Sequence, residues 1–166
     1  ETTILCGNSI VDGKYFSYRG ISTLEHLELS LVKPFEWHTA FPEIFSNGGF
    51  DVIVGNPPYT KIQNMVHYSP QEVGYYQSEF APYLSSHANN FDKYQLFFER
   101  AISLLSKKGC LGFIVPHKFM STKAGEALRG VVANNKILKE LIHFGANQVF
   151  GSQATTYTCI IILQNN

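Results

Sequence analysis

The sequence has few charged residues and no long hydrophobic run, and both absences narrow the class of protein. Charged residues make up 16% of the 166 residues and hydrophobic residues 45%, which excludes a disordered chain and a coiled coil. No apolar run approaches the roughly 18 residues that a membrane-spanning helix needs. The N-terminus does not resemble a signal peptide. We therefore expect a single globular domain that contacts no membrane.

Cysteine is also scarce, and its distribution excludes two further classes. Cys6, Cys110 and Cys159 are odd in number and widely spaced, and no Cys-x-x-Cys pair occurs. A disulfide framework and a zinc site are therefore poor interpretations, and buried thiols in a reducing cytosol fit better. The six histidines show no ligand spacing such as His-x-x-x-His, so we expect no metal site.

The net charge is zero, but the charges are unevenly distributed. Residues 1–92 hold ten acidic and four basic residues, whereas residues 93–166 hold three acidic and nine basic residues. This excludes a uniformly basic nucleic-acid binder. Two interpretations stay open, namely one basic face or ordinary solvated charges that are unevenly spread.

Short apolar runs predict the strands. They lie at residues 4–6, 51–55, 111–115, 141–144 and 156–163. Because these runs are apolar throughout rather than alternating, we expect strands that are covered on both faces.

Between these strands, apolar residues at three- and four-residue spacing predict helices. One helix is expected over 93–107, ending at Gly109, and a second over 122–134, capped by Ser121 or Thr122. Strands that alternate with helices indicate an α/β fold with a largely parallel sheet. The polar segment 60–92 reads as a long loop or small insertion.

Residues 50–59 carry the most informative pattern, Phe-Asp-Val-Ile-Val-Gly-Asn-Pro-Pro-Tyr. Ligand sites in open α/β sheets lie at the carboxyl ends of strands, so the turn after Gly55 marks a candidate site. Pro57 and Pro58 have fixed φ angles and no N–H donors, which leaves a corner rich in acceptors at Asn56 and Pro57, beside the ring of Tyr59. Such a corner suits a planar amino group. The alternative is a turn that holds two prolines by chance.

The turn resembles the catalytic motif of S-adenosylmethionine-dependent amino-methyltransferases, specifically the N6-adenine DNA methyltransferases. Further segments extend the resemblance and indicate the type IIG restriction–modification (Eco57I-like) subgroup. They are residues 4–9, 35–50, 92–99, 109–116, 149–151 and 156–163. The resemblance implies a Rossmann-like methyltransferase fold over residues 1–166, with only the C-terminal part of its sheet present and the first strands missing.

The resemblance also implies roles for single residues. Asn56 and the Pro57 carbonyl, in the turn completed by Pro58, would accept hydrogen bonds from the N6 amino group of adenine. Tyr59 and Phe150 would stack on the two faces of a base flipped out of double-stranded DNA.

Other roles concern the cofactor and the DNA backbone. Asn8 and Phe97 would contact S-adenosylmethionine, although the family usually carries an acidic residue at the position of Asn8. Independently of the resemblance, Lys118 follows Pro116 at the carboxyl end of a predicted strand and is a candidate contact for a backbone phosphate. Core packing remains the alternative for Phe97 and Phe150, and a merely solvated side chain the alternative for Lys118. Tyr75-Tyr76 could stack on nucleic acid or simply pack.

Several parts of such an enzyme are missing from the sequence. No Gly-x-Gly cofactor loop, target-recognition domain or nuclease motif occurs. We therefore expect the middle of a longer, cytoplasmic bacterial or archaeal enzyme, inactive alone. The rival hypotheses are a methyltransferase acting on a protein glutamine or on RNA, and a non-catalytic fragment that binds DNA or a partner.

Overall fold

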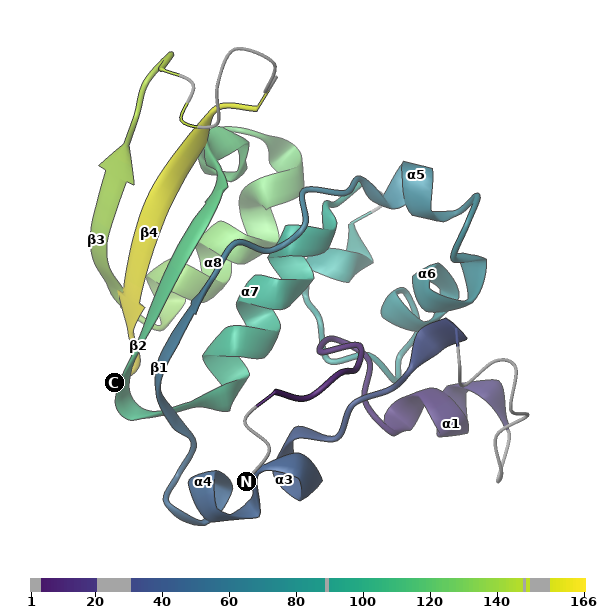
Figure 1. Cartoon of the computed structure of the whole chain (residues 1–166). Helices are drawn as coiled ribbons and strands as arrows, with labels where there is room; N and C mark the ends of the chain where they lie inside the picture. The colour runs from purple at the N-terminus through teal and green to yellow at the C-terminus, as the bar shows by residue number, and fades with distance from the viewer. Residues whose placement is uncertain (1–3, 21–30, 89, 148, 150–155) are drawn as a thin grey trace.

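The computed structural model describes residues 4–20, 31–88, 90–147, 149 and 156–166. Four strands form one sheet in the order β1-β2-β4-β3 (Figure 1). β1 spans Phe50–Gly55, β2 Leu105–Pro116, β3 Leu138–His143 and β4 Thr158–Gln164. Four of the predicted strands are thus confirmed, with shifted ends. The segment 4–6 forms no strand, and the exposure of Ile4 is 85%.

The pairing of the strands is mixed rather than largely parallel. β1 runs parallel to β2, but β4 lies antiparallel between β2 and β3. Residues 144–157 connect β3 to β4, which lie next to each other in the sheet. β1, β2 and β3 still point in one direction, so their carboxyl ends share one edge of the sheet.

The main core lies between the sheet and two helices, α7 (Lys93–Leu104) and α8 (Glu126–Asn134), which Figure 1 shows on the same side of the sheet. The Phe98 ring packs edge-on against Phe113, with 5.4 Å between centroids. α7 contributes Tyr94, Phe98 and Ala101 to this core. A capping box begins the helix, in which Asp92 accepts from the backbone of Gln95 and the Gln95 side chain accepts from the backbone of Asp92.

Both predicted helices differ from the structure at one end. α7 stops at Leu104 because Leu105 has an extended backbone (φ −71°, ψ 140°) and begins β2. The expected stop at Gly109 therefore lies within a strand. α8 begins after a 3-10 turn at Lys123–Gly125, and neither Ser121 nor Thr122 caps it. A Cβ at Gly125 would lie 2.1 Å from the Phe119 carbonyl oxygen, so this tight approach requires glycine.

The expectation that the sheet is covered on both faces is wrong within the described residues. The exposures of Val52 and Val54 are 64% and 76%. Val54, Gly112 and Ile162 are paired across three strands, so they share the face opposite the core. Both helices of the main core lie on the other side of the sheet, so an apolar sequence in β1 does not imply burial.

The double substitution Val52→Thr/Val54→Thr should reduce self-association of the 166-residue chain without lowering its stability. Exposed apolar patches drive association, and threonine keeps the β-branched shape that strands favour. Sedimentation over a concentration series, together with urea unfolding, would measure both effects. Undiminished association, or a lower unfolding midpoint, would contradict the exposure of this face.

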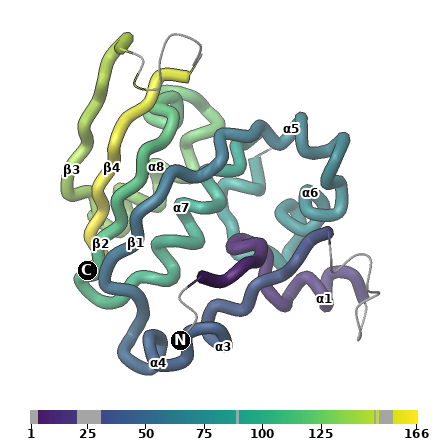
Figure 2. Tube along the Cα trace, viewed as in Figure 1, coloured from purple at the N-terminus to yellow at the C-terminus, as the bar shows by residue number. Residues whose placement is uncertain are grey.

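A second core joins the N-terminal segment to residues 60–92, which lie side by side (Figure 2). The N-terminal segment holds α1 (Lys14–Arg19), and residues 60–92 hold α5 (Ile62–Met65), α6 (Pro70–Tyr76) and a 3-10 turn (Ser85–His87). The described residues of 60–92 are therefore packed into this core rather than forming a solvated loop, and their status as an insertion stays a prediction. The Tyr75 hydroxyl donates to Asp12 (2.8 Å), and Tyr75 and Tyr76 are fully buried. These two tyrosines pack and do not offer their rings to a ligand.

Two short helices, α3 (Trp37–Ala40) and α4 (Pro42–Ser46), lead into β1. The Trp37 and Phe41 rings stack with 5.9 Å between centroids, and both rings contact Phe50 at the start of the strand. This aromatic cluster anchors the segment that precedes β1 and places Trp37 beside the strand.

Candidate functional site

The turn after β1 lies at the shared carboxyl edge of β1, β2 and β3. Gly55 pairs with Phe113 in the parallel ladder, and a Cβ at Gly55 would lie 3.1 Å from the Phe113 ring. Asn56 is exposed and Pro57 is buried. Among the described residues, neither the Asn56 side chain nor the Pro57 carbonyl has a hydrogen-bond partner. The acceptors expected from the sequence are therefore free to bind a ligand.

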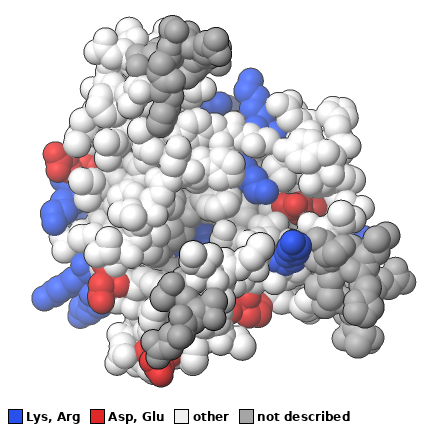
Figure 3. Space-filling view, in the orientation of Figure 1, with Lys and Arg blue, Asp and Glu red and all other residues white. Residues whose placement is uncertain are grey.

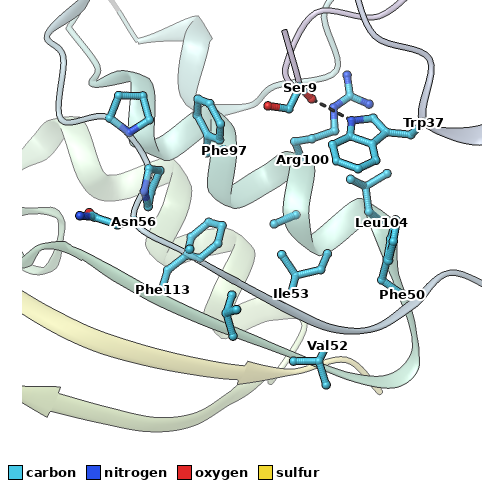
Figure 4. A pocket seen from close by; sticks show the side chains of 15 residues that line it. Ser9, Trp37, Phe50, Val52, Ile53, Asn56, Phe97, Arg100, Leu104 and Phe113 are labelled. Carbon is cyan, nitrogen blue, oxygen red and sulfur yellow. Dashed lines mark hydrogen bonds between the residues drawn. The ribbon is translucent and has the colours of Figure 1, made fainter. Parts of the chain in front are cut away.

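A cavity of about 500 Å³ lies next to this turn, between β1, α7 and the segments around Ser9 and Trp37 (Figure 4). Its wall is mostly apolar. It includes Trp37, Phe50, Ile53, Asn56, Pro57, Pro58, Phe97, Arg100, Leu104 and Phe113. Figure 4 shows the Asn56 amide at one end of the cavity, directed away from the aromatic rings. The cavity thus offers ring faces, and the turn offers polar acceptors beside them.

Three long-range hydrogen bonds hold the wall opposite the turn. The Trp37 indole donates to the Ser9 carbonyl (3.0 Å, dashed in Figure 4). The Arg100 guanidinium donates to Asp12 (2.8 Å) and to the Tyr83 hydroxyl (3.1 Å). Burial alone would lower the pKa of Arg100, but Tyr83 and Asp12 outweigh it and raise the pKa. Arg100 therefore stays charged, and its ion pair with Asp12 neutralises that charge at the cavity wall.

The ring of Tyr59 is half-buried beside the turn. Its hydroxyl donates to the Ile114 carbonyl (3.0 Å), and its ring meets Tyr94 edge-on with 6.3 Å between centroids. Burial, and then the nearby Cys159, raise the pKa of the Tyr59 hydroxyl. The phenol is therefore neutral near pH 7 and is not a candidate general base.

The two expected cofactor residues lie in different surroundings. Phe97 lines the cavity and also packs against both cores. Asn8 does not line the cavity, and its side chain donates to Glu72 (3.1 Å). Glu72 also accepts from the Tyr76 hydroxyl and from Lys93. The structure thus brings Phe97, but not Asn8, together with the turn.

The remaining expected residues differ in how far the structure describes them. Lys118 forms an ion pair with Asp92 (2.5 Å between Nζ and Oδ2) and keeps 42% of its side chain exposed. Phe150 lies outside the described residues.

The sequence analysis did not predict Arg100 and Trp37 as residues of the cavity wall. For Arg100, its place on the polar side of an amphipathic helix was the only available signal.

The face of the molecule in Figure 3 carries no large basic patch. Acidic and basic side chains lie scattered among uncharged atoms, and basic atoms also lie near its centre. The charges on this face therefore fit the interpretation of solvated charges that are unevenly spread along the chain.

In the part of the chain that the structure describes, no three histidine, cysteine, aspartate or glutamate side chains gather in a way that could hold a metal ion. None of the helices described combines the length and the apolar character needed to cross a membrane.

The fold is that of a class I methyltransferase. A Listeria monocytogenes protein assigned to the class I S-adenosylmethionine-dependent methyltransferases superposes with a TM-score of 0.51 at 20% identity, over 71% of this chain and 32% of that one. The DNA-bound ATP-dependent Type ISP restriction-modification enzyme LlaBIII gives a TM-score of 0.50 at 17% identity, over 92% of this chain and 11% of that one.

The sequence comparisons assign a family within this class. Residues 9–150 match the Eco57I restriction-modification methylase family, and this chain belongs to that family. The Escherichia coli type II restriction enzyme and methyltransferase RM.Eco57I is 37% identical over 98% of this chain and 14% of its own length. The Haemophilus influenzae type II methyltransferase M.HincII is 32% identical over 70% of this chain and 22% of its own length. The chain thus spans less than a quarter of either relative.

Proposed function

We propose that this chain carries the methyl-transfer site of a restriction–modification enzyme that methylates the N6 amino group of adenine in double-stranded DNA. S-Adenosylmethionine is the methyl donor in this proposal. The observation that carries it is the turn at Asn56 and Pro57, whose acceptors have no partner among the described residues and lie at the mouth of an apolar cavity.

The residues of the cavity fit the proposed donor. Its volume of about 500 Å³ lies within the usual range of small-molecule sites. Phe97, Trp37 and Phe113 offer the aromatic faces that a purine ring requires. When bound, S-adenosylmethionine supplies an electrophilic methyl group on a sulfonium. Asn8 stays a predicted contact, and its bond to Glu72 would have to open before it could reach a ligand.

The turn would act on the amino group that receives the methyl. Asn56 Oδ1 and the Pro57 carbonyl would accept its two hydrogens, which orients the nitrogen lone pair toward the cavity. Positioning and preorganised acceptors can supply a large part of such a rate enhancement. Tyr59 would stack on one face of the flipped base, and Phe150 is proposed for the other face.

Labelled S-adenosylmethionine, offered to the full-length protein with duplex DNA and total cell protein together, tests this proposal. We expect label in DNA, recovered as N6-methyladenine. Label in protein would instead support a glutamine-directed enzyme, and label only in added RNA would support an RNA enzyme. Absence of transfer to any acceptor would favour a binding fragment.

The cytoplasmic location and the bacterial or archaeal source of the protein stay predictions.

Substitutions at Tyr59 should separate its ring from its hydroxyl. Tyr59→Ala removes the stacking surface, which is worth about 1–3 kcal/mol per base, so methyl transfer should fall on the order of 10- to 100-fold. Tyr59→Phe loses only the bond to Ile114 and should keep the rate within about fivefold, because the net contribution of one neutral hydrogen bond is about 1 kcal/mol. Steady-state kinetics of both variants would measure this, and equal losses in both would argue against stacking.

A further inference from the structure

A second, polar cavity lies beside the turn, at the N-terminal end of α7. Its volume is about 580 Å³, and its wall includes Lys61, Asp92, Tyr94, Lys118 and Lys123. The Tyr59 ring packs against Tyr94, and Lys61 follows Tyr59 by two residues. The polar cavity therefore adjoins the proposed methyl-transfer site without sharing its apolar wall.

The charges in this cavity favour an anion. Lys118 pairs with Asp92 at 2.5 Å, which neutralises the one carboxylate in the wall. Lys61 and Lys123 are exposed and have no ion-pair partner in the part of the chain that the structure describes. Two lysine charges thus remain uncompensated around one hollow. The first turn of α7 adds the partial positive charge of a helix N-terminus.

Tyr94, which lines the same cavity, also carries a buried hydroxyl without a partner. The Tyr94 side chain is fully buried, and its hydroxyl makes no hydrogen bond with any residue that the structure describes. Burial, and then the charge of Asp92, raise the pKa of this hydroxyl, so it stays protonated and remains a donor. An unpartnered buried hydroxyl is costly, and a ligand oxygen would satisfy it.

We propose that this polar cavity binds a phosphodiester group of the DNA strand that carries the target base. Lys61 and Lys123 supply the charge. The Tyr94 hydroxyl is fully buried in this structure, so it would have to turn toward the cavity before it could donate to a phosphate oxygen. This inference rests on the proposed function, because it takes the DNA strand to enter at Tyr59. A seated phosphate next to the turn would set the position of the nucleotide whose base reaches Asn56.

The first test measures how DNA binding depends on salt. Fluorescence anisotropy with the full-length protein would compare Lys61→Gln/Lys123→Gln with the matched control Lys107→Gln/Lys139→Gln, whose lysines are exposed and lie outside this cavity. Losing one phosphate contact lowers the slope of log K against log salt by about 0.9. We expect that change in the first variant and not in the control. An unchanged slope in the first variant overturns the proposal.

The second test locates the phosphate. A neutral methylphosphonate placed at successive positions around the target base should weaken binding by the wild type on the order of tenfold at one position, and should not further weaken Lys61→Gln/Lys123→Gln there. Equal losses in both proteins at every position would exclude a phosphate at these lysines. Inorganic phosphate that raises the melting temperature of the wild type alone, with no position-dependent loss, would reassign the cavity to free phosphate and overturn the DNA role.

Tyr94→Phe separates a binding role from a structural one. The variant should bind DNA several-fold more weakly while its melting temperature without DNA stays equal or rises, because the unpartnered hydroxyl is removed. A lower melting temperature with unchanged DNA affinity would show a structural hydroxyl and count against the proposal.

Methyl transfer by the wild type reports separately on the proposed function. If the wild type binds DNA with the expected salt effect but transfers no methyl group, that result would reject the proposed function and leave the phosphate site standing.

Discussion

Replacing Asn56 by alanine should lower methyl transfer by about 10³-fold, the loss expected when a preorganised group that acts on the reacting atom is removed. The side chain is exposed and has no partner among the described residues, so its loss should not disturb the fold. DNA affinity should stay within about threefold, because the proposed contact strengthens in the transition state rather than in the ground state. Single-turnover kinetics and a binding titration would measure the two effects.

Asn134→Ala is the matched control for this substitution. Asn134 is also exposed, and it lies at the last position of α8, away from the cavity. The control should transfer methyl groups at the rate of the wild type. If Asn56→Ala retained more than a tenth of the wild-type rate, the turn would not be the site of methyl transfer.

Arg100→Met should lower the free energy of unfolding by about 3 kcal/mol at neutral pH, because removing one partner of a largely buried ion pair leaves the other charge uncompensated. Asp12 and Arg100 expose only 15% and 12% of their side chains. Their pair joins the N-terminal segment to α7 and also supports the cavity wall. Urea unfolding would measure the change, and exposed Lys139→Met should stay within about 0.5 kcal/mol of the wild type.

The pH dependence of the same variant identifies the cause. Burial alone would raise the pKa of Asp12, but hydrogen bonds from Arg100 and Tyr75 and the charge of Arg100 lower it below 3.8. In the wild type the pair therefore stabilises the fold above pH 3.8 and loses this effect as the pH falls further.

Without Arg100, burial should raise the pKa of Asp12 above its unfolded value. The folded variant then binds a proton more tightly than the unfolded chain, so its stability is greatest in acid and falls as the pH rises through the raised pKa. Arg100→Met should therefore lose less stability at pH 4 than at pH 8, and Asp12→Asn/Arg100→Met should recover part of the loss. A loss that is independent of pH would indicate missing packing instead.

Local patterns in the sequence were sufficient to predict the strand, the turn and the helix that carry the candidate site. The β-branched run before Gly55 and the two prolines after Asn56 define a strand and a rigid turn through backbone preferences alone. The apolar spacing of 93–107 predicted α7, because a helix buries one face. The length of that helix was overestimated, since the strand β2 competes for Leu105 and the residues that follow it.

The sequence alone determined that this chain has an α/β fold with an acceptor-rich turn at the end of a strand. Only the tertiary structure decided which residues meet there. Arg100 pairs with Asp12 across 88 positions, and Asn8 bonds to Glu72 across 64. The packing of α7 and α8 on one side of the sheet likewise left the valines of β1 exposed on the other side. Such contacts depend on how packed elements approach one another, whereas strand and turn formation depend on neighbouring residues along the chain.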